Sequence, residues 1–152
     1  MIVTGDHVVQ WVEEQLDITI DLRGAVGVGW MQDGHLAQGA VFYNYTGRNM
    51  YIHVACRTGY RLSPTFVAAM MDYPFTQAHV QRLTGLIPSC NEQGKALAMR
   101  LGGRLEGRMR EVLDSGDLLV YGLLKRDAAR WLTAAYHRRL RPIGEAHETV
   151  SA

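Results

Sequence analysis

The chain has 152 residues, of which 47% are hydrophobic and 20% are charged, a composition typical of one soluble globular domain and not of a disordered chain. Its formal net charge of +1 creates no overall field that would attract nucleic acid or an anionic membrane. Two cysteines, Cys56 and Cys90, are too few for a disulfide scaffold and lack metal-site spacing. Cys56 lies in an apolar stretch, so we expect a buried free thiol.

The N-terminus shows no basic start followed by an apolar run, so no signal peptide is expected. No apolar stretch reaches the length of a bilayer span. We therefore expect a cytoplasmic protein without a membrane partner. A single domain is expected over residues 1–141, with a flexible tail over 142–152.

The first half of the chain predicts a helix followed by three antiparallel strands. An edge strand over 1–4 precedes a helix over 7–16, which Asp6 can cap and in which apolar residues recur at helical spacing. Gln32-Asp33-Gly34 is a hairpin signal. The three strands of this meander are expected over residues 25–31, 36–45 and 50–56.

The middle of the chain changes pattern after a polar loop over 57–62. Ser63-Pro64 predicts the start of a helix, with Ser as the cap and Pro in the first turn. This helix is expected over 64–71 and should stop before Tyr73-Pro74. A strand rich in β-formers follows over 79–87.

The last third predicts a helix, a hairpin and a final helix. Asn91 can cap a helix over 92–101, and Gly102-Gly103 can end it. Two strands over 104–113 and 118–124 and a helix over 127–137 complete the chain. The order β-α-β-β-β-α-β-α-β-β-α predicts a mixed sheet with helices on both faces.

The loop 57–62 has features of an anion site. Backbone N–H groups at a helix N-terminus favour negative charge, and Gly59 would let a ligand approach the backbone closely. Arg57 and Arg61 could pair with phosphate oxygens. An ordinary strand-to-helix turn in front of a well-capped helix would explain the same residues.

A more specific pattern lies further on. Residues 91–110 read NEQGKALAMRLGGRLEGRMR, and residues 117–132 read DLLVYGLLKRDAARWL. This segment resembles the C-terminal half of acyl-CoA N-acyltransferases of the GNAT superfamily, most closely the branch that acetylates ribosomal-protein N-termini and small phage-encoded members. The resemblance covers about residues 25–132 and is best over 79–131. The residues that match the pattern are Asn91, Leu101-Gly102, Glu106-Gly107, Arg110, Asp117 and Tyr121.

The resemblance implies an α/β (α+β) fold with a mixed, mostly antiparallel sheet of six to seven strands. Strands 50–56 and 79–87 would form a central parallel pair that splays and admits acetyl-CoA. The implied enzyme transfers an acetyl group from acetyl-CoA to a primary amine by direct attack. The acceptor stays open between a protein amine, a small amine and a modified nucleobase. A catalytically degenerate scaffold that binds CoA or a protein partner is the alternative.

The resemblance also implies site residues. Backbone groups near the end of strand 50–56 would pair with the pantetheine arm, and the following loop would hold the diphosphate. Asn91 would lie near the pantetheine, in addition to its capping role. The implied cofactor-binding residues are Val54, Ala55, Cys56, Arg57, Thr58, Gly59, Tyr60, Arg61 and Asn91.

Three positions depart from the family pattern. Residues 57–62 are only a variant of the usual diphosphate loop. Met99 stands where the family often has a Tyr that protonates the leaving thiolate, and Met cannot donate a proton. Gly103 replaces the usual Phe, which predicts altered packing at that corner.

His53 is the first candidate for the general base, because imidazole titrates near neutral pH and the residue lies next to the expected thioester site. A satisfied core histidine would explain it as well. Tyr60 is the candidate acid, with Tyr73 and Tyr121 as further hydroxyls, although core packing explains Tyr121 better. No metal is expected.

Two partner questions stay open. The cluster Arg104, Arg108 and Arg110 would suit a polyanionic acceptor such as nucleic acid, although a solvated strand face explains it equally. A homodimer is possible, and a phage origin would place the protein in the host cytoplasm.

Overall fold

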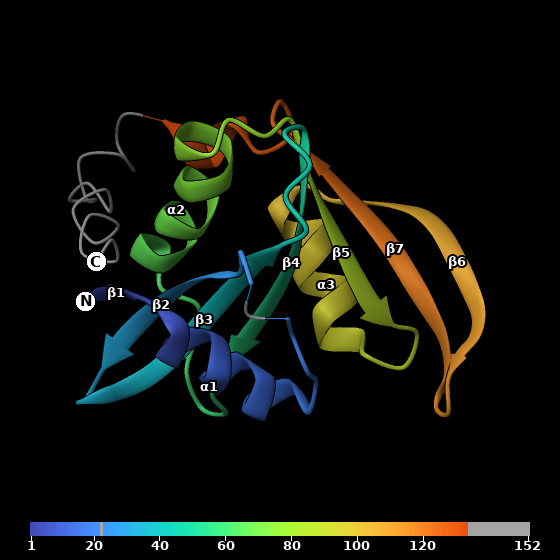
Figure 1. Ribbon diagram of the computed structural model, residues 1–152, viewed down its shortest axis with the longest axis horizontal. Coiled ribbons are helices and arrows are strands. Elements are labelled where there is room, and N and C mark those ends of the chain that lie inside the picture. The colour runs from blue at the N-terminus through green and yellow to red at the C-terminus, as the bar shows by residue number, and fades with distance from the viewer. Residues whose placement is uncertain (22, 134–152) are drawn as a thin grey trace.

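In a computed structural model, which describes residues 1–21 and 23–133, the chain folds around one seven-stranded sheet with the strand order β1-β2-β3-β4-β5-β7-β6 (Figure 1). Every neighbouring pair is antiparallel except β4 and β5, which run parallel. The strands are β1 (Ile2–Thr4), β2 (Val26–Gln32), β3 (His35–Tyr43), β4 (Asn49–Cys56), β5 (Arg82–Pro88), β6 (Arg104–Leu113) and β7 (Gly116–Leu124). The helices are α1 (Asp6–Leu16), α2 (Pro64–Asp72), which continues as the π-helix η1 (Tyr73–Gln77), α3 (Glu92–Leu101) and the 3-10 helix η2 (Ala129–Leu132).

The meander forms where its turn signals predict it. Asp33 and Gly34 both adopt positive φ, 53° and 82°, as a two-residue type I′ hairpin requires. β2, β3 and β4 then pair antiparallel in sequence order. The expected mixed, mostly antiparallel sheet with a central parallel pair is therefore confirmed.

The helices cover both faces of this sheet. On one face, α1 packs so closely that a Cβ added at Gly27 or Gly39 would lie 2.8 Å from its backbone or side-chain atoms. The core under α1 includes Val12, Val41 and Ala55. The opposite face carries α2 and the end of α3 over a larger core. This larger core is formed mainly by Phe42, Met50, Phe66, Met70, Phe75, Leu83 and Leu123.

The parallel pair is short and opens towards its C-terminal end. β4 and β5 pair over four positions, from Asn49 with Arg82 to Ile52 with Gly85. Beyond that point β4 stays with β3, while β5 continues beside β7 as far as Pro88. The strands thus separate after Ile52 and Gly85, which confirms the predicted splay.

Several element boundaries differ from the sequence-based expectation. The helix over 64–71 does not stop before Tyr73-Pro74. Pro74 cannot donate the N–H that an α-helix needs there, and the chain widens into a π-turn in which the Ala78 amide donates to Tyr73 at 2.9 Å. The next strand begins at Arg82 instead of residue 79, because His79 adopts a positive φ of 56°.

The two chain ends show further differences. Gly5, not Asp6, is the N-cap of α1, and Asp6 lies in its first turn. In place of a helix over 127–137 there is the short 3-10 helix η2, and residues 134–137 lie outside the described part. The predicted tail over 142–152 also lies outside it. None of the described helices combines the length and the apolar character of a membrane span.

Candidate functional site

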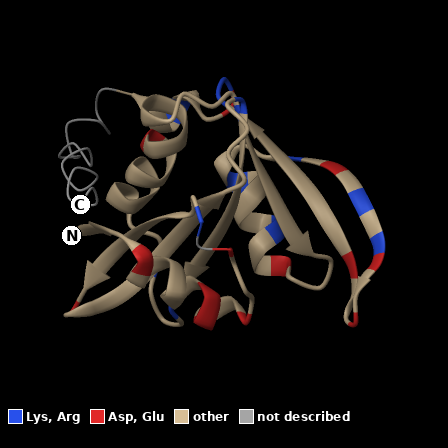
Figure 2. Ribbon diagram, in the orientation of Figure 1, with Lys and Arg blue, Asp and Glu red and all other residues tan. Residues whose placement is uncertain are grey.

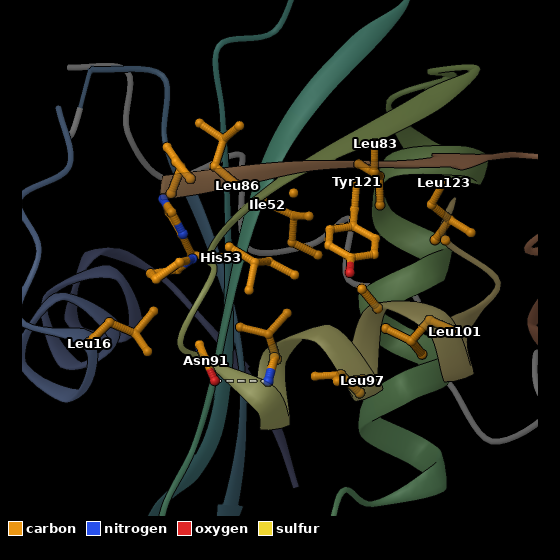
Figure 3. A pocket seen from close by; sticks show the side chains of 18 of the residues that line it. Leu16, Ile52, His53, Leu83, Leu86, Asn91, Leu97, Leu101, Tyr121 and Leu123 are labelled. Carbon is orange, nitrogen blue, oxygen red and sulfur yellow. Dashed lines mark hydrogen bonds between the residues drawn. The ribbon is translucent and has the colours of Figure 1, made fainter. Parts of the chain in front are cut away.

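A cavity of about 380 Å³ opens where β4 and β5 separate. It passes through the sheet, so it is lined from both faces. Leu16 of α1 and His53 of β4 lie on one side, whereas Leu97 and Leu101 of α3 lie on the other (Figure 3). Its lining is mostly aliphatic and includes no Asp, Glu, Lys or Arg. The separated strands therefore enclose an uncharged apolar space in the middle of the sheet.

The backbone of β4 presents free hydrogen-bonding groups to this gap. The Arg57 amide donates to the Ala37 carbonyl at 2.8 Å, so Ala37 and Arg57 are a hydrogen-bonded antiparallel pair. Since such pairs alternate, the N–H and C=O of Ala55 also face β3, while those of Val54 and Cys56 face the gap. β5 is not paired with them, because its pairing with β4 ends at Gly85.

The loop that follows β4 offers further unpaired amides. Among the described residues, the N–H groups of Thr58, Gly59 and Arg61 have no acceptor, whereas the Tyr60 amide donates to the Arg57 carbonyl at 3.1 Å. Ser63 caps α2 by accepting from the Phe66 amide at 3.4 Å. Gly59 has a positive φ of 89° and open space around its Cα. The loop thus exposes amides beside a helix N-terminus, an arrangement that favours anions.

A buried glutamine fixes the shape of this loop. Gln38 of β3 is fully buried, donates from Nε2 to the Arg61 carbonyl at 2.6 Å and accepts at Oε1 from the Ser63 amide at 2.9 Å. Both ends of the side-chain amide are therefore satisfied by the loop and by the start of α2. The sequence analysis did not single out Gln38, and no local motif marks it.

The two cationic side chains of the loop lie in different surroundings. Arg57 donates from Nε to the Leu36 carbonyl at 3.0 Å and stacks on Trp11 with 5.9 Å to the ring centroid. It is thereby held against the β2–β3 hairpin. Arg61 is exposed and has no ion-pair partner among the described residues. Of the two, Arg61 is the one free to approach a phosphate.

His53 lies in the cavity together with a tyrosine that the sequence analysis missed. The Tyr43 hydroxyl lies 2.9 Å from His53 Nε2, and the two rings are stacked 5.2 Å apart. Burial lowers the pKa of His53, and burial followed by the neighbouring Tyr51 raises the pKa of Tyr43. Both effects keep the pair uncharged near neutral pH.

The structure does not bring Tyr60 to this pair. Its hydroxyl lies 2.8 Å from His35 Nε2 and donates to Asp33 at 3.3 Å, which places it at the tip of the β2–β3 hairpin. Tyr121 lies in the cavity instead, 6% exposed, and its hydroxyl points towards α3 (Figure 3). That hydroxyl bonds to no other described residue. Met99, in contrast, is 64% exposed on the outer face of α3.

The remaining predicted residues are placed as follows. Asn91 lines the cavity and caps α3, accepting from the Gly94 amide at 2.9 Å (Figure 3), so its capping role is confirmed. Cys56 is exposed and not buried, because it ends β4 at the mouth of the gap. Partial burial nevertheless raises the pKa of its thiol. Within the described residues, no group of three or more His, Cys, Asp or Glu could hold a metal ion.

Comparison with known proteins yields structural matches only. No sequence family matches the chain, and no curated protein matches it in sequence. A crystal structure of a probable acetyltransferase is similar with a TM-score of 0.60 and 23% identity, covering 79% of this chain and 69% of that one. Spermidine N-acetyltransferase from Vibrio cholerae, solved with CoA and spermine, has a TM-score of 0.62 and 14% identity over 82% of this chain and 77% of its own.

A third solved structure is an acetyltransferase of the GNAT family from Bacillus anthracis. Its TM-score is 0.57 at 16% identity, with 77% of this chain and 72% of that chain covered. At these identities the likeness concerns the fold. The chain therefore has the fold of GNAT-family acetyltransferases.

Proposed function

We propose that this chain is an acyl-CoA-dependent N-acyltransferase that acylates a primary amine. The observation that carries the proposal is the gap between β4 and β5, where the backbone groups of Val54 and Cys56 have no strand partner. An extended pantetheine arm carries amide groups that could bond to this edge as a strand would. The first gap-facing backbone group past the separation belongs to Val54, so in this proposal the thioester would lie near Val54 and Gly85.

The loop 57–62 supports diphosphate binding in this proposal. The free amides of Thr58, Gly59 and Arg61 would donate to phosphate oxygens at the N-terminus of α2, and exposed Arg61 adds a positive charge. Arg57, Cys56 and Tyr60 shape the loop, because each of them bonds within it or to the β2–β3 hairpin. Asn91 would contact the arm from the start of α3.

The amine would approach from the α1 side of the sheet, where His53 and Tyr43 lie. Tyr43 accepts the proton that the amine nitrogen loses as the C–N bond forms, and passes its own proton to His53 Nε2. The Val54 N–H donates to the carbonyl oxygen as negative charge develops there. The Ala55 amide, which faces β3, takes no part in this step.

On the opposite side of the sheet, Tyr121 would supply the proton that the leaving thiolate needs. Its free hydroxyl faces the cavity from β7, level with Gly85, and can give a proton to the sulfur as the C–S bond breaks. It would replace the tyrosine that Met99 cannot provide from α3. Tyr60, bonded to His35 and Asp33, would contribute to loop structure instead of acid catalysis.

The charges on the surface near the site do not identify the acceptor. Arg104, Arg108 and Arg110 lie on β6 together with acidic residues, so positive and negative side chains are interspersed along this strand (Figure 2). Arg108 pairs with Asp117 at 2.6 Å, and Arg104 lies 3.9 Å from Asp127. This partial neutralisation weakens the case for a polyanionic acceptor, and a protein or small-molecule amine is favoured.

A two-step experiment tests the proposal. Acetyl-CoA at a hundred times its Kd should stabilise the native state by about 2.7 kcal/mol, which a thermal melt detects. Release of free thiol with a panel of primary amines should then follow. An unchanged melting temperature at millimolar acetyl-CoA would exclude the proposed function. A shift without thiol release for any amine would favour the alternative, a non-catalytic CoA-binding scaffold.

A further inference from the structure

The cavity does not end where β4 and β5 rejoin. The strands meet at Ile52 and Gly85, which is where the proposed thioester site lies. The cavity nevertheless continues along β5 to Leu83 and along its neighbour β7 to Leu123. These paired residues lie two positions further on, about 6.6 Å at the usual rise of a strand. A space therefore extends beyond the reacting centre, away from the mouth.

This extension runs under the full length of α3. Asn91, the cap of the helix, lies at the mouth, and Leu97 and Leu101 line the cavity successively deeper (Figure 3). The ten residues of α3 span about 15 Å. Next to this end of the cavity, Trp131 of η2 donates from Nε1 to the Leu101 carbonyl at 3.0 Å and holds the end of α3 in place. We call the part of the cavity lined by Leu83, Leu97, Leu101 and Leu123 the deep chamber.

One glycine leaves room in the deep chamber. A Cβ built at Gly85 meets no atom within 4 Å, although this residue lies in the middle of the sheet. Gly103 also lines the space, but an added Cβ there would lie 2.9 Å from the Ala98 carbonyl oxygen, so this glycine allows close packing against α3 and leaves no free room. In a close-packed protein interior, room such as that at Gly85 is unusual.

The lining restricts what the deep chamber can hold. Its walls are the aliphatic side chains of Leu83, Leu97, Leu101 and Leu123, and its polar group is the Tyr121 hydroxyl at the entrance. No charged side chain of the described residues lines it, so a carboxylate buried there would be uncompensated. The space thus suits a chain or ring of carbon atoms and rejects a dicarboxylic acyl group.

We infer that the deep chamber is an acyl-binding subsite and that the preferred donor is a CoA thioester with an apolar acyl group longer than acetyl. The inference rests on the proposed function, because the acyl group reaches the chamber only from a thioester bound in the gap. Each methylene that enters an apolar site strengthens binding about fourfold. Gly85 is the residue that would set the acyl size limit.

The test is a binding series with CoA, acetyl-CoA, hexanoyl-CoA and succinyl-CoA, measured by calorimetry. The wild-type protein should bind hexanoyl-CoA at least tenfold more tightly than acetyl-CoA, and succinyl-CoA no better than CoA. The variants Gly85→Ala and Gly85→Leu should remove this preference stepwise, measured in each variant as the ratio of the Kd for acetyl-CoA to the Kd for hexanoyl-CoA. Gly107→Leu on β6 is the matched control, since the nearest atom to its added Cβ is the Cβ of Val120 on β7 at 4.0 Å, and neither residue lines the cavity.

The outcomes separate this inference from the proposed function. If no CoA compound binds, both are wrong. If CoA and acetyl-CoA bind but hexanoyl-CoA binds no better, the acyl subsite is excluded and the acyltransferase proposal stands. A hexanoyl preference that Gly85→Leu leaves intact would likewise overturn the assignment of the deep chamber.

Discussion

The contact between Tyr43 and His53 is the residue-scale feature with the clearest catalytic consequence. If the pair removes the amine proton, His53→Gln should lower kcat by about a hundredfold, in line with the contribution of a general base, and leave the Kd for acetyl-CoA unchanged. Tyr43→Phe should lower kcat less, because the ring nitrogen remains. Tyr51→Phe is a suitable control, since the Tyr51 ring lies 5.5 Å from the Tyr43 ring at a tilt of 36° but does not line the cavity.

The pH dependence provides a second readout of the same residue. Burial lowers the pKa of His53 below its usual 6.5. The neutral base therefore persists below pH 6.5, and the acidic limb of kcat/KM should lie below that value. Between pH 6.5 and the lowered pKa the unfolded chain binds more protons than the folded one, so stability falls as the pH drops through this window. His53→Gln should flatten both profiles, whereas a limb above pH 6.5 that survives in the variant would exclude His53 as the base.

At the scale of elements, Gln38 joins β3 to the loop before α2. Gln38→Leu would leave the Arg61 carbonyl and the Ser63 amide without partners, at about 1–3 kcal/mol for each group that stays buried. Because the loop is proposed to hold the diphosphate, the affinity for acetyl-CoA should fall much more than that for S-acetylpantetheine, which lacks the diphosphate. Calorimetry with both ligands tests this, and Gln10→Leu, on the exposed side of α1, is the control. An equal loss for both ligands would contradict a loop-specific role.

Elements with strong local signals could be predicted from the sequence. The cap Asn91 and the C-terminal Gly102, which has a left-handed φ of 107°, delimit α3 at the expected residues. Asp33-Gly34 fixes the first hairpin in the same way. Pro74 was a weaker guide: it ends the α-helix, but the sequence did not indicate that the chain would continue as the π-helix η1 with Phe75 buried.

The candidate site was predictable only in part, because it depends on pairing between distant strands. His53 and the residues after β4 could be identified from their place on one strand and from the resemblance. Tyr43 could not, since it reaches His53 only through the register that pairs Val41 with His53. The same register decides that the backbone N–H and C=O of Ala55 face β3. The deep chamber depends on how α3 packs across β5 and β7.

On the scale of the whole molecule, the gap divides the sheet into two parts. One contains β1 to β4 with α1, and the other contains β5 to β7 with α3. Within the described sheet they are joined by the four β4–β5 residue pairs and by the amides of Gln81 and Arg82, which donate to the Arg48 carbonyl, with the core under α2 and η2 joining them on one face. A ligand in the gap would bond to both parts and thereby link them.

This division predicts a specific pattern of hydrogen exchange. Without ligand, the β4 amides that face the gap, Val54 and Cys56, should exchange faster than those of Ile52, which lies within the parallel pairing. Acetyl-CoA should slow exchange at Val54 and Cys56, in the loop 57–62 and at the start of α3. Hexanoyl-CoA should extend protection to the end of α3, because an acyl group in the deep chamber would contact Leu97 and Leu101. Amide exchange followed by NMR resolves these positions, and protection confined to one side of the gap would show that the ligand does not bridge the sheet.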